Sequence, residues 1–185
     1  MHTMKKIITS LFSVFALAVL FTFSSTTTFA QERAEGGVRV SPNAAVSQNI
    51  GATVVNVTYG RPGLKGRSLE SLAPAGQVWR TGANESAAIT FSTDVMFGGE
   101  MVEAGTYSLY TIPGDNWTII LNKKLSWGTS YDVAEDVIRV PAAVTTTEAA
   151  PMEWFAIYFD TLSETKTHLN LHWGTTLTAI PITIE

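Results

Sequence analysis

The sequence predicts an all-β protein, an antiparallel β-sandwich of jelly-roll-like or related type, with roughly eight to nine strands and little helix. Two observations support this prediction. Short runs of β-branched and aromatic residues alternate with polar residues, and clusters of glycine, proline, asparagine and aspartate separate these runs. In addition, no segment shows the apolar periodicity of a long amphipathic helix.

The strand with the clearest pattern comes early in the domain. In 53–59 the apolar side chains of Val55, Val57 and Tyr59 fall on one face. Further along, the pair Gly98-Gly99 predicts a tight hairpin, because both central positions of such a turn favour positive φ. The strand-like runs, from which we expect roughly eight to nine strands, are 53–59, 88–92, 94–97, 100–102, 106–112, 117–122, 136–140, 153–159, 168–173 and 177–184.

Two further features refine this pattern. Only 68–72 and 130–135 could each form a helical turn. Pro181 lies inside the last strand, and because proline has no N–H to donate, it predicts that this strand lies at a sheet edge.

Residues 1–30 have the order of a secretory signal peptide, with two lysines before an apolar stretch, 7–21, and small residues up to Ala30, after which we expect cleavage. The alternative is a transmembrane anchor, but the apolar stretch is shorter than the ~20 residues that a spanning helix needs. We therefore expect an exported protein, periplasmic or extracellular, with no membrane span after cleavage. It would consist of a flexible leader, 31–37, and a single β-sandwich domain, 38–185.

The composition excludes several classes of function. The chain has 185 residues, a formal net charge of −4 and no cysteine. Its acidic balance argues against a nucleic-acid partner, and the absence of cysteine removes thiol catalysis and cysteine-ligated zinc. We expect no cofactor and no metal, and we regard an enzymatic activity as the less favoured reading.

Two glycine-containing segments differ from ordinary core and turn sequences. The first, 59–67, places three cations within seven residues, and the second, 78–85, holds a tryptophan, an arginine, an amide and a carboxylate. Arginine binds carboxylates and phosphates in a bidentate manner, and tryptophan offers a flat face to a sugar. The candidate ligand-binding residues are Tyr59, Arg61, Lys65, Arg67, Trp79, Arg80, Asn84, Glu85 and, from a later loop, Trp127. In the competing interpretation, Arg80 pairs internally with Glu85 or Asp132 and Trp79 fills the core.

Several strings of this chain occur together in one known family: Tyr59-Gly60-Arg61-Pro62, Lys65-Gly66-Arg67, Trp79-Arg80-Thr81-Gly82-Ala83-Asn84-Glu85, Gly105-Thr106-Tyr107-Ser108-Leu109 and Trp117-Thr118-Ile119-Ile120-Leu121-Asn122. The chain resembles the bacterial domain-of-unknown-function family numbered twenty-nine eleven, whose members are typically exported. The resemblance spans about Ser41 to Ile182. It implies an exported β-domain and assigns no catalytic residue. The late strand of the family usually runs to Trp-Glu, whereas here Trp173 is followed by Gly174.

Other candidate sites are weaker. His168 and His172 share one face of a predicted strand, too far apart to chelate one ion. The carboxylates near 132–136 lack the pattern of a calcium loop, which favours a solvated acidic turn. The tryptophans of the predicted strands (Trp117, Trp154 and Trp173) are assigned to the core.

Three functional hypotheses follow. The favoured one is a binding module that holds a small anionic or polyhydroxylated ligand, such as a glycan fragment, between the two segments. The second is a structural or protein-interaction domain in which the motif forms an internal salt-bridge network. The third is an envelope-acting hydrolase with Glu85 as a weak candidate for general acid or base.

Overall fold

The computed structural model describes residues 33, 36–127, 129–146 and 151–184. The residues assigned to the signal peptide lie outside this part of the chain. Its strands are β1 (Asn43–Ile50), β2 (Thr53–Gly60), β3 (Ala87–Phe91), β4 (Val95–Phe97), β5 (Glu100–Val102), β6 (Gly105–Ile112), β7 (Asn116–Asn122), β8 (Asp136–Thr146), β9 (Met152–Ser163), β10 (Lys166–Gly174) and β11 (Thr176–Thr183).

The two short helices form where helical turns were predicted. They are α1 (Leu69–Leu72) and the 3-10 helix η1 (Val133–Glu135). Each begins at a polar cap: the side chain of Ser68 accepts a hydrogen bond from Ser71 N, and that of Asp132 accepts one from Ala134 N. These caps satisfy backbone N–H groups that a helix leaves unpaired at its start.

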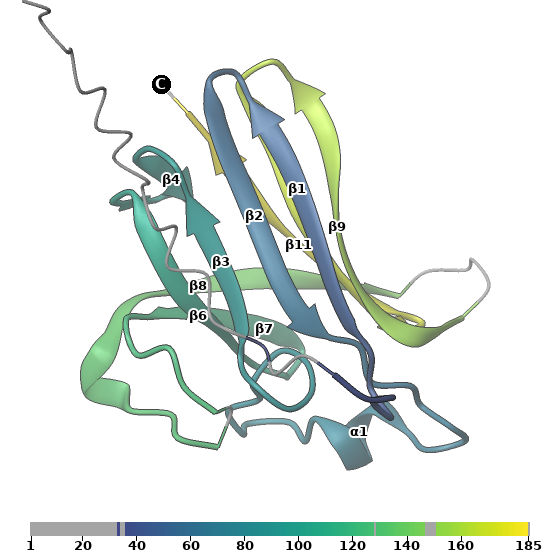
Figure 1. Cartoon of the computed structure of the whole chain (residues 1–185). Coiled ribbons are helices and arrows are strands. Elements are labelled where there is room, and N and C mark those ends of the chain that lie inside the picture. The colour runs from purple at the N-terminus through teal and green to yellow at the C-terminus, as the bar shows by residue number, and fades with distance from the viewer. Residues whose placement is uncertain (1–32, 34–35, 128, 147–150, 185) are drawn as a thin grey trace, which may run out of the picture.

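All paired strands are antiparallel, in the order β1-β2-β3-β6-β7-β8-β11-β10-β9, with the β4–β5 hairpin attached to β11. The long strand β8 pairs with β7 up to Ala143 and with β11 from Val144, so it passes from one sheet to the other. The result is a nearly closed, barrel-like sandwich (Figure 1), which confirms the all-β prediction.

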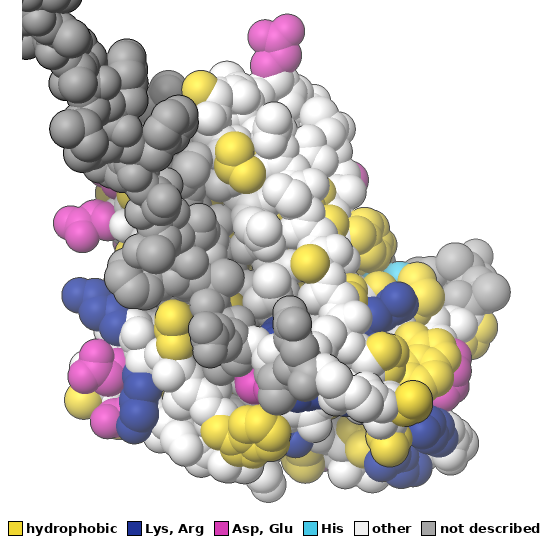
Figure 2. All heavy atoms as spheres, in the orientation of Figure 1, with side chains coloured by type: hydrophobic (Ala, Val, Ile, Leu, Met, Phe, Trp, Pro, Cys, Tyr) yellow, Lys and Arg dark blue, Asp and Glu magenta, His cyan; other side chains and the backbone are white. Residues whose placement is uncertain are grey.

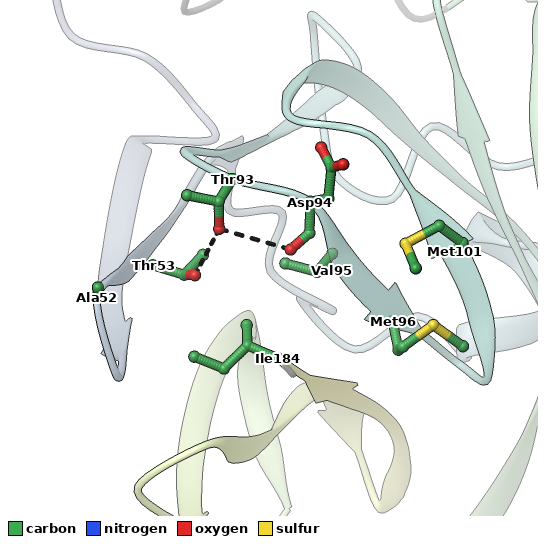
Figure 3. A pocket seen from close by; sticks show the side chains of 8 residues that line it. All are labelled: Ala52, Thr53, Thr93, Asp94, Val95, Met96, Met101 and Ile184. Atoms are coloured by element: carbon green, nitrogen blue, oxygen red, sulfur yellow. Dashed lines mark hydrogen bonds between the residues drawn. The ribbon is translucent and has the colours of Figure 1, made fainter.

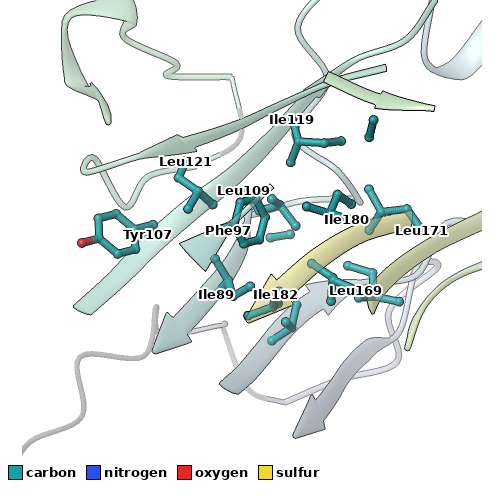
Figure 4. Close-up of a cluster of buried hydrophobic side chains, with 14 of the residues drawn as sticks. Ile89, Phe97, Tyr107, Leu109, Ile119, Leu121, Leu169, Leu171, Ile180 and Ile182 are labelled. Atoms are coloured by element: carbon teal, nitrogen blue, oxygen red, sulfur yellow. The ribbon is translucent and has the colours of Figure 1, made fainter. Parts of the chain in front are cut away.

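The core fills the space between the two sheets, as the alternation predicts. The inward residues of β3, β6 and β7 meet those of β10 and β11 across this space (Figure 4), and most are fully buried. The labelled members are Ile89, Phe97, Tyr107, Leu109, Ile119, Leu121, Leu169, Leu171, Ile180 and Ile182. This face-to-face burial of apolar surface is the main stabilising contribution in a domain of this size.

The structure has one long strand that the pattern did not predict. β1 carries only Val46 and Ile50 as β-branched residues, and alanine, asparagine and glutamine fill most of it. Its strand conformation comes from pairing with β2 over its whole length. The described residues hold eleven strands, and β1 is one reason why this exceeds eight to nine.

The prediction that Pro181 marks an edge strand was wrong. β11 lies between β10 on one side and β8 and β4 on the other. The proline is tolerated because β8 pairs with β11 only as far as Thr178, and β4 begins to pair at Ile182. Pro181 therefore lies between these two pairings, where its carbonyl oxygen accepts a hydrogen bond from Gly98 N at 2.8 Å. By contrast, the predicted hairpin at Gly98-Gly99 is present, with φ values of +61° and +93°.

The strand order begins at β1 and ends at β9. On the side of β9 where no further strand pairs with it, two side chains from the β2 region contact its backbone. The hydroxyl of Tyr59 accepts a hydrogen bond from Ile157 N at 2.9 Å, and Arg61 Nε donates to Phe155 O at 2.9 Å. Both groups come from the end of β2 and the loop after it. This loop and α1 lie at the lower end of the molecule in Figure 1, while the β4–β5 hairpin and the C-terminus lie at the upper end.

Candidate functional site

The two glycine-containing segments meet at a very close backbone approach. A Cβ atom added at Gly82 would lie 2.8 Å from Gly60 O, and a Cβ added at Gly60 would overlap Ala83 O. Neither position can therefore hold a side chain without a backbone shift. Gly60 and Gly82 thus allow one loop to pack against the other.

Unusual backbone conformations surround this contact. Thr81, Asn84 and Lys65 have φ values of +53°, +67° and +50°, in the left-handed region that non-glycine residues rarely adopt. Thr81 is fully buried and β-branched, so it adopts this conformation at an energetic cost that the surrounding packing must offset. The turn Thr81-Gly82-Ala83-Asn84 is thus held in this conformation by the packing around it.

The first two aromatic candidates lie in the core. Trp79 is 8% exposed and stacks on Trp173 at 5.4 Å between ring centroids with an interplanar angle of 16°. It also packs edge-on against Trp117 and Phe155, and Phe155 in turn contacts the ring of Tyr59. Aromatic pairs in these geometries stabilise a core beyond the area that they bury. Their place in the core matches the competing interpretation of Trp79.

Glu85 is buried and forms ion pairs with two arginines that precede β1. Arg39 donates to both carboxylate oxygens, from Nη1 to Oε2 at 3.0 Å and from Nη2 to Oε1 at 3.1 Å. Arg33 Nη1 lies 3.4 Å from Oε2, and Arg33 Nη2 donates to the backbone oxygens of Thr58 and Ser86. The pairing with Arg80 that the competing interpretation offered is thus replaced by two cations from the N-terminal side.

Burial and neighbouring charges shift the pKa values of both arginines in this cluster. Burial lowers the pKa of Arg33 to about 10, against the raising effect of Glu85 and the further lowering effect of Arg39. The hydrogen bonds that Arg39 donates to Glu85 raise the pKa of Arg39. A carboxylate held by two guanidinium groups is stabilised as an anion. This arrangement suits a structural ion-pair cluster better than a group that must gain and release protons.

The cations of the first segment lie together beside the start of β9. Arg61 donates to Phe155 O, and Arg67 donates through Nε to Leu64 O and through Nη2 to Gly63 O, each at 3.0 Å. Lys65 Nζ lies 5.7 Å from the centroid of the Trp154 ring, within the range of a cation–π contact. We call Arg61, Lys65, Arg67 and Trp154 the basic loop surface. In Figure 2 the dark blue side chains of this face of the molecule gather in its lower half, where the loops lie.

The basic loop surface is not neutralised within the described part of the chain. No carboxylate there lies within salt-bridge distance of its three cations. Glu153 contacts this loop through the backbone, because its Oε1 accepts a hydrogen bond from the backbone N–H of Lys65 at 2.7 Å. Carbonyl oxygens carry no net charge, so they hold the two guanidinium groups in place without cancelling the positive charge.

The remaining candidates are distributed around the second segment. Trp127 is 55% exposed, and its backbone forms an isolated bridge with Glu85. Asn84 is half-buried at the left-handed turn. Arg80 Nε is buried without a hydrogen-bond partner among the described residues. Since Trp79 is in the core and Trp127 is at the surface, the two do not form one stacking platform.

Sequence reasoning missed three residues of these two clusters. Trp154 was assigned to the core but is 37% exposed, because Phe155 and Ile157 are the residues of β9 that point inward. The alternation of 153–159 carried this signal. Arg33 and Arg39 had no such signal, since nothing local marks an arginine that contacts a carboxylate 46 or 52 positions away.

The weaker candidates take part in local structure. His168 Nδ1 lies 3.4 Å from Asp160 Oδ1, and His172 is 8% exposed beside Tyr158. Asp136 accepts hydrogen bonds from Tyr131 and Arg139. The described residues contain no group of three or more histidine, aspartate or glutamate side chains placed to hold a metal ion, and no helix among them is long and apolar enough to cross a membrane.

Comparison with known proteins identifies the family and nothing more specific. Neither a curated protein nor a solved structure matches the chain significantly. A family model described as "Protein of unknown function (DUF2911)" matches residues 41–182, which include both glycine-containing segments and every strand except the last residue of β11. The chain therefore belongs to the DUF2911 family.

Proposed function

We propose that this protein is a binding module whose basic loop surface recognises a small anionic or polyhydroxylated ligand of the glycan type. The observation that carries the proposal is the set of three positioned cations, Arg61, Lys65 and Arg67, that have no carboxylate partner among the described residues. Guanidinium groups fixed by carbonyl oxygens lose little side-chain entropy on binding, which favours affinity.

The chemistry of the surface suits a ligand with both an anionic group and an apolar ring face. Arg67 uses two of its N–H donors on its own loop, so others remain for a carboxylate, sulfate or phosphate. The partly exposed Trp154 adds flat apolar area beside the ammonium of Lys65. Sugars that carry an acidic substituent combine these two features.

The buried state of Glu85 makes a hydrolase that uses this residue the weaker alternative. Its side chain is 5% exposed, and both carboxylate oxygens accept hydrogen bonds from Arg39. A general acid or base must reach a substrate proton within hydrogen-bond distance. The ion pairs of Glu85 instead favour the structural interpretation for the segment 78–85.

We also infer that the protein is exported. The inference rests on the lysine pair, the apolar stretch and the small residues before Ala30. An exported location would give the basic loop surface access to envelope glycans and other extracellular anions.

Calorimetric titration with named probes tests the proposed function. The probes are glucuronate, glucose 6-phosphate, citrate, inorganic phosphate and the neutral disaccharide cellobiose. We expect at least one anionic sugar to bind and to raise the melting temperature by mass action. Lys65→Ala and Arg67→Ala should remove this binding and leave the melting temperature of the free protein within a few degrees.

The matched control is Lys123→Ala, which removes an exposed lysine from the end of the β7 region. It should bind the same probe with unchanged affinity. If no probe binds, or if Lys123→Ala weakens binding as much as Arg67→Ala does, the basic loop surface is not the recognition site.

A further inference from the structure

A pocket lies away from the basic loop surface, beside the β4–β5 hairpin. It has a volume of about 650 Å³ and lies between the start of β2, the segment before β4, the hairpin and Ile184. Figure 3 shows its lining side chains, which come from these four parts of the chain. A pocket of this volume can hold a small organic molecule.

The walls of the pocket are mainly apolar. Val95 is 2% exposed at its floor, and Met96 and Met101 are cross-strand partners on the β4–β5 hairpin. Ile184 is held beside Gly51, where an added Cβ would lie 2.7 Å from its Cδ1. Methionine side chains are flexible and polarizable, so they adapt to apolar ligands of different shape. Met101 is 55% exposed, and a protein gains by covering such a side chain.

Two of the polar groups of the pocket are already paired. The hydroxyls of Thr53 and Thr93 hydrogen-bond to each other at 2.6 Å. Asp94 Oδ1 accepts a hydrogen bond from Ala104 N at 2.8 Å, which fixes the carboxylate on the side of the pocket that faces away from Ile184 (Figure 3). Asp94 has no salt-bridge partner among the described residues, so its charge remains available.

Further acidic groups strengthen the negative charge near Asp94. Glu100 and Glu103 are exposed on the hairpin and just after it. Burial is the largest cause of the raised pKa of Tyr107, and the charges of Glu103 and Asp94 raise it further. Both carboxylates therefore lie close enough to act on the same hydroxyl. Lys166, whose backbone pairs with Thr183 next to Ile184, contributes an opposing positive charge. In the upper half of Figure 2, the visible charged side chains of this face are magenta.

We propose that this pocket binds a small cationic amphiphile, a molecule with a primary ammonium head and an apolar chain or ring. The ammonium contacts Asp94, and the apolar body lies against Met96, Met101 and Ile184. The combination of one fixed carboxylate with thioether and aliphatic walls selects this class over anionic or purely polar molecules. The site is independent of the basic loop surface and has the opposite charge.

Methyl NMR of the full chain with [methyl-13C]methionine tests the proposal. The probe is decylammonium at concentrations below micelle formation, and decyl sulfate is the head-group control. Decylammonium should shift the methyl signals of Met96 and Met101 in a saturable way, while Met152, on β9 and away from the pocket, should not move. Decyl sulfate should bind at least about tenfold more weakly. Met96→Leu and Met101→Leu assign the two signals.

Asp94→Asn should weaken decylammonium binding about tenfold, because the amide still accepts from Ala104 N but carries no charge. The matched control is Asp115→Asn, which neutralises an exposed aspartate in the β6–β7 turn and should leave the affinity unchanged. Equal binding of decyl sulfate, equal shifts at Met152, or no shift at Met96 and Met101 in the wild-type protein would each overturn the proposal.

Discussion

Arg39 and Glu85 face each other in a two-pronged ion pair, with N···O distances of 3.0 and 3.1 Å between their paired atoms. Arg33 adds a second, more deeply buried guanidinium on the same carboxylate. The segment 78–85 in mid-chain is therefore joined to a segment that precedes the first strand.

Replacement of Glu85 by glutamine should strongly destabilise the protein. Glu85→Gln leaves Arg33, whose side chain is 7% exposed, without the negative charge that compensates its burial. Loss of one partner from a buried ion pair costs about 3 kcal/mol. Urea unfolding followed by tryptophan fluorescence measures this cost. Glu100→Gln, at an exposed site on the hairpin, is the control and should leave the unfolding midpoint unchanged. Equal midpoints for the two variants would contradict the structural role of Glu85.

The two tryptophans proposed for one platform should differ in their contribution to stability. Trp79→Ala removes a buried indole that stacks on Trp173, which should cost about 3–5 kcal/mol. Trp127→Ala removes an exposed indole and should change the free energy of unfolding by no more than about 0.5 kcal/mol. The same urea experiment compares them, and a large loss at Trp127 alone would mean that its loop packs differently.

Two glycine substitutions should separate steric overlap from backbone strain. Gly60→Ala places a methyl group against Ala83 O, so the two loops must move apart, at a cost of about 2–3 kcal/mol. Gly66→Ala has open space but a φ of +77°, so it should cost only about 1 kcal/mol. Thermal and urea unfolding give both values. Should Gly66→Ala prove the more damaging change, the close approach of the loops would not be the critical contact.

The stability of the protein should fall at alkaline pH through Tyr131. Burial, together with the hydrogen bond that the Tyr131 hydroxyl donates to Asp136, raises the pKa of Tyr131 to about 12. In the unfolded chain a tyrosine titrates near ~10, so the folded state holds the proton more tightly. The contribution of Tyr131 is therefore fully present below the unfolded pKa and is lost as the pH rises from there towards 12.

Urea midpoints at pH ~9 and ~11 measure this loss. Burial also raises the pKa values of Tyr107 and Tyr158, so the wild-type protein carries a background that Tyr131→Phe shares. The variant should lose less stability between the two pH values than the wild type. An equal loss would show that Tyr131 does not contribute.

Expression with the native N-terminus in an exporting host should yield a chain that begins at Gln31. Intact-mass measurement of the purified protein checks the cleavage point. Recovery of an uncleaved chain in the membrane fraction would favour the anchor alternative instead.

The sequence predicted those parts of the fold that depend on local pattern. Alternation in 53–59 predicted that Val55, Val57 and Tyr59 enter the core, and 68–72 and 130–135 were the two segments predicted to form a helical turn. It failed for β1, whose alanine and asparagine residues have weak strand preference and adopt the strand by pairing with β2. It also failed for Pro181, because the position of a strand within a sheet depends on distant partners.

The candidate site was less accessible to sequence reasoning for the same physical reason. Residue types identified the cations and tryptophans of the motif, but side-chain direction depends on which partners the fold brings close. Trp79 and Glu85 lie next to polar neighbours in the sequence and are both buried by residues far away in it. Arg61, Lys65 and Arg67 gather because Gly63 pairs with Trp154, a contact between positions distant in the chain.

The position of Arg33 and Arg39 also affects how pieces of this protein should be produced. A fragment trimmed to the span of the family match, 41–182, keeps Glu85 and discards Arg33 and Arg39, which form ion pairs with it. Such a fragment would keep the buried Glu85 carboxylate without the two positive charges that Arg33 and Arg39 place against it. Poor yield or early melting of this fragment would then arise from the choice of boundary, and expression from residue 31 onward would restore the partners.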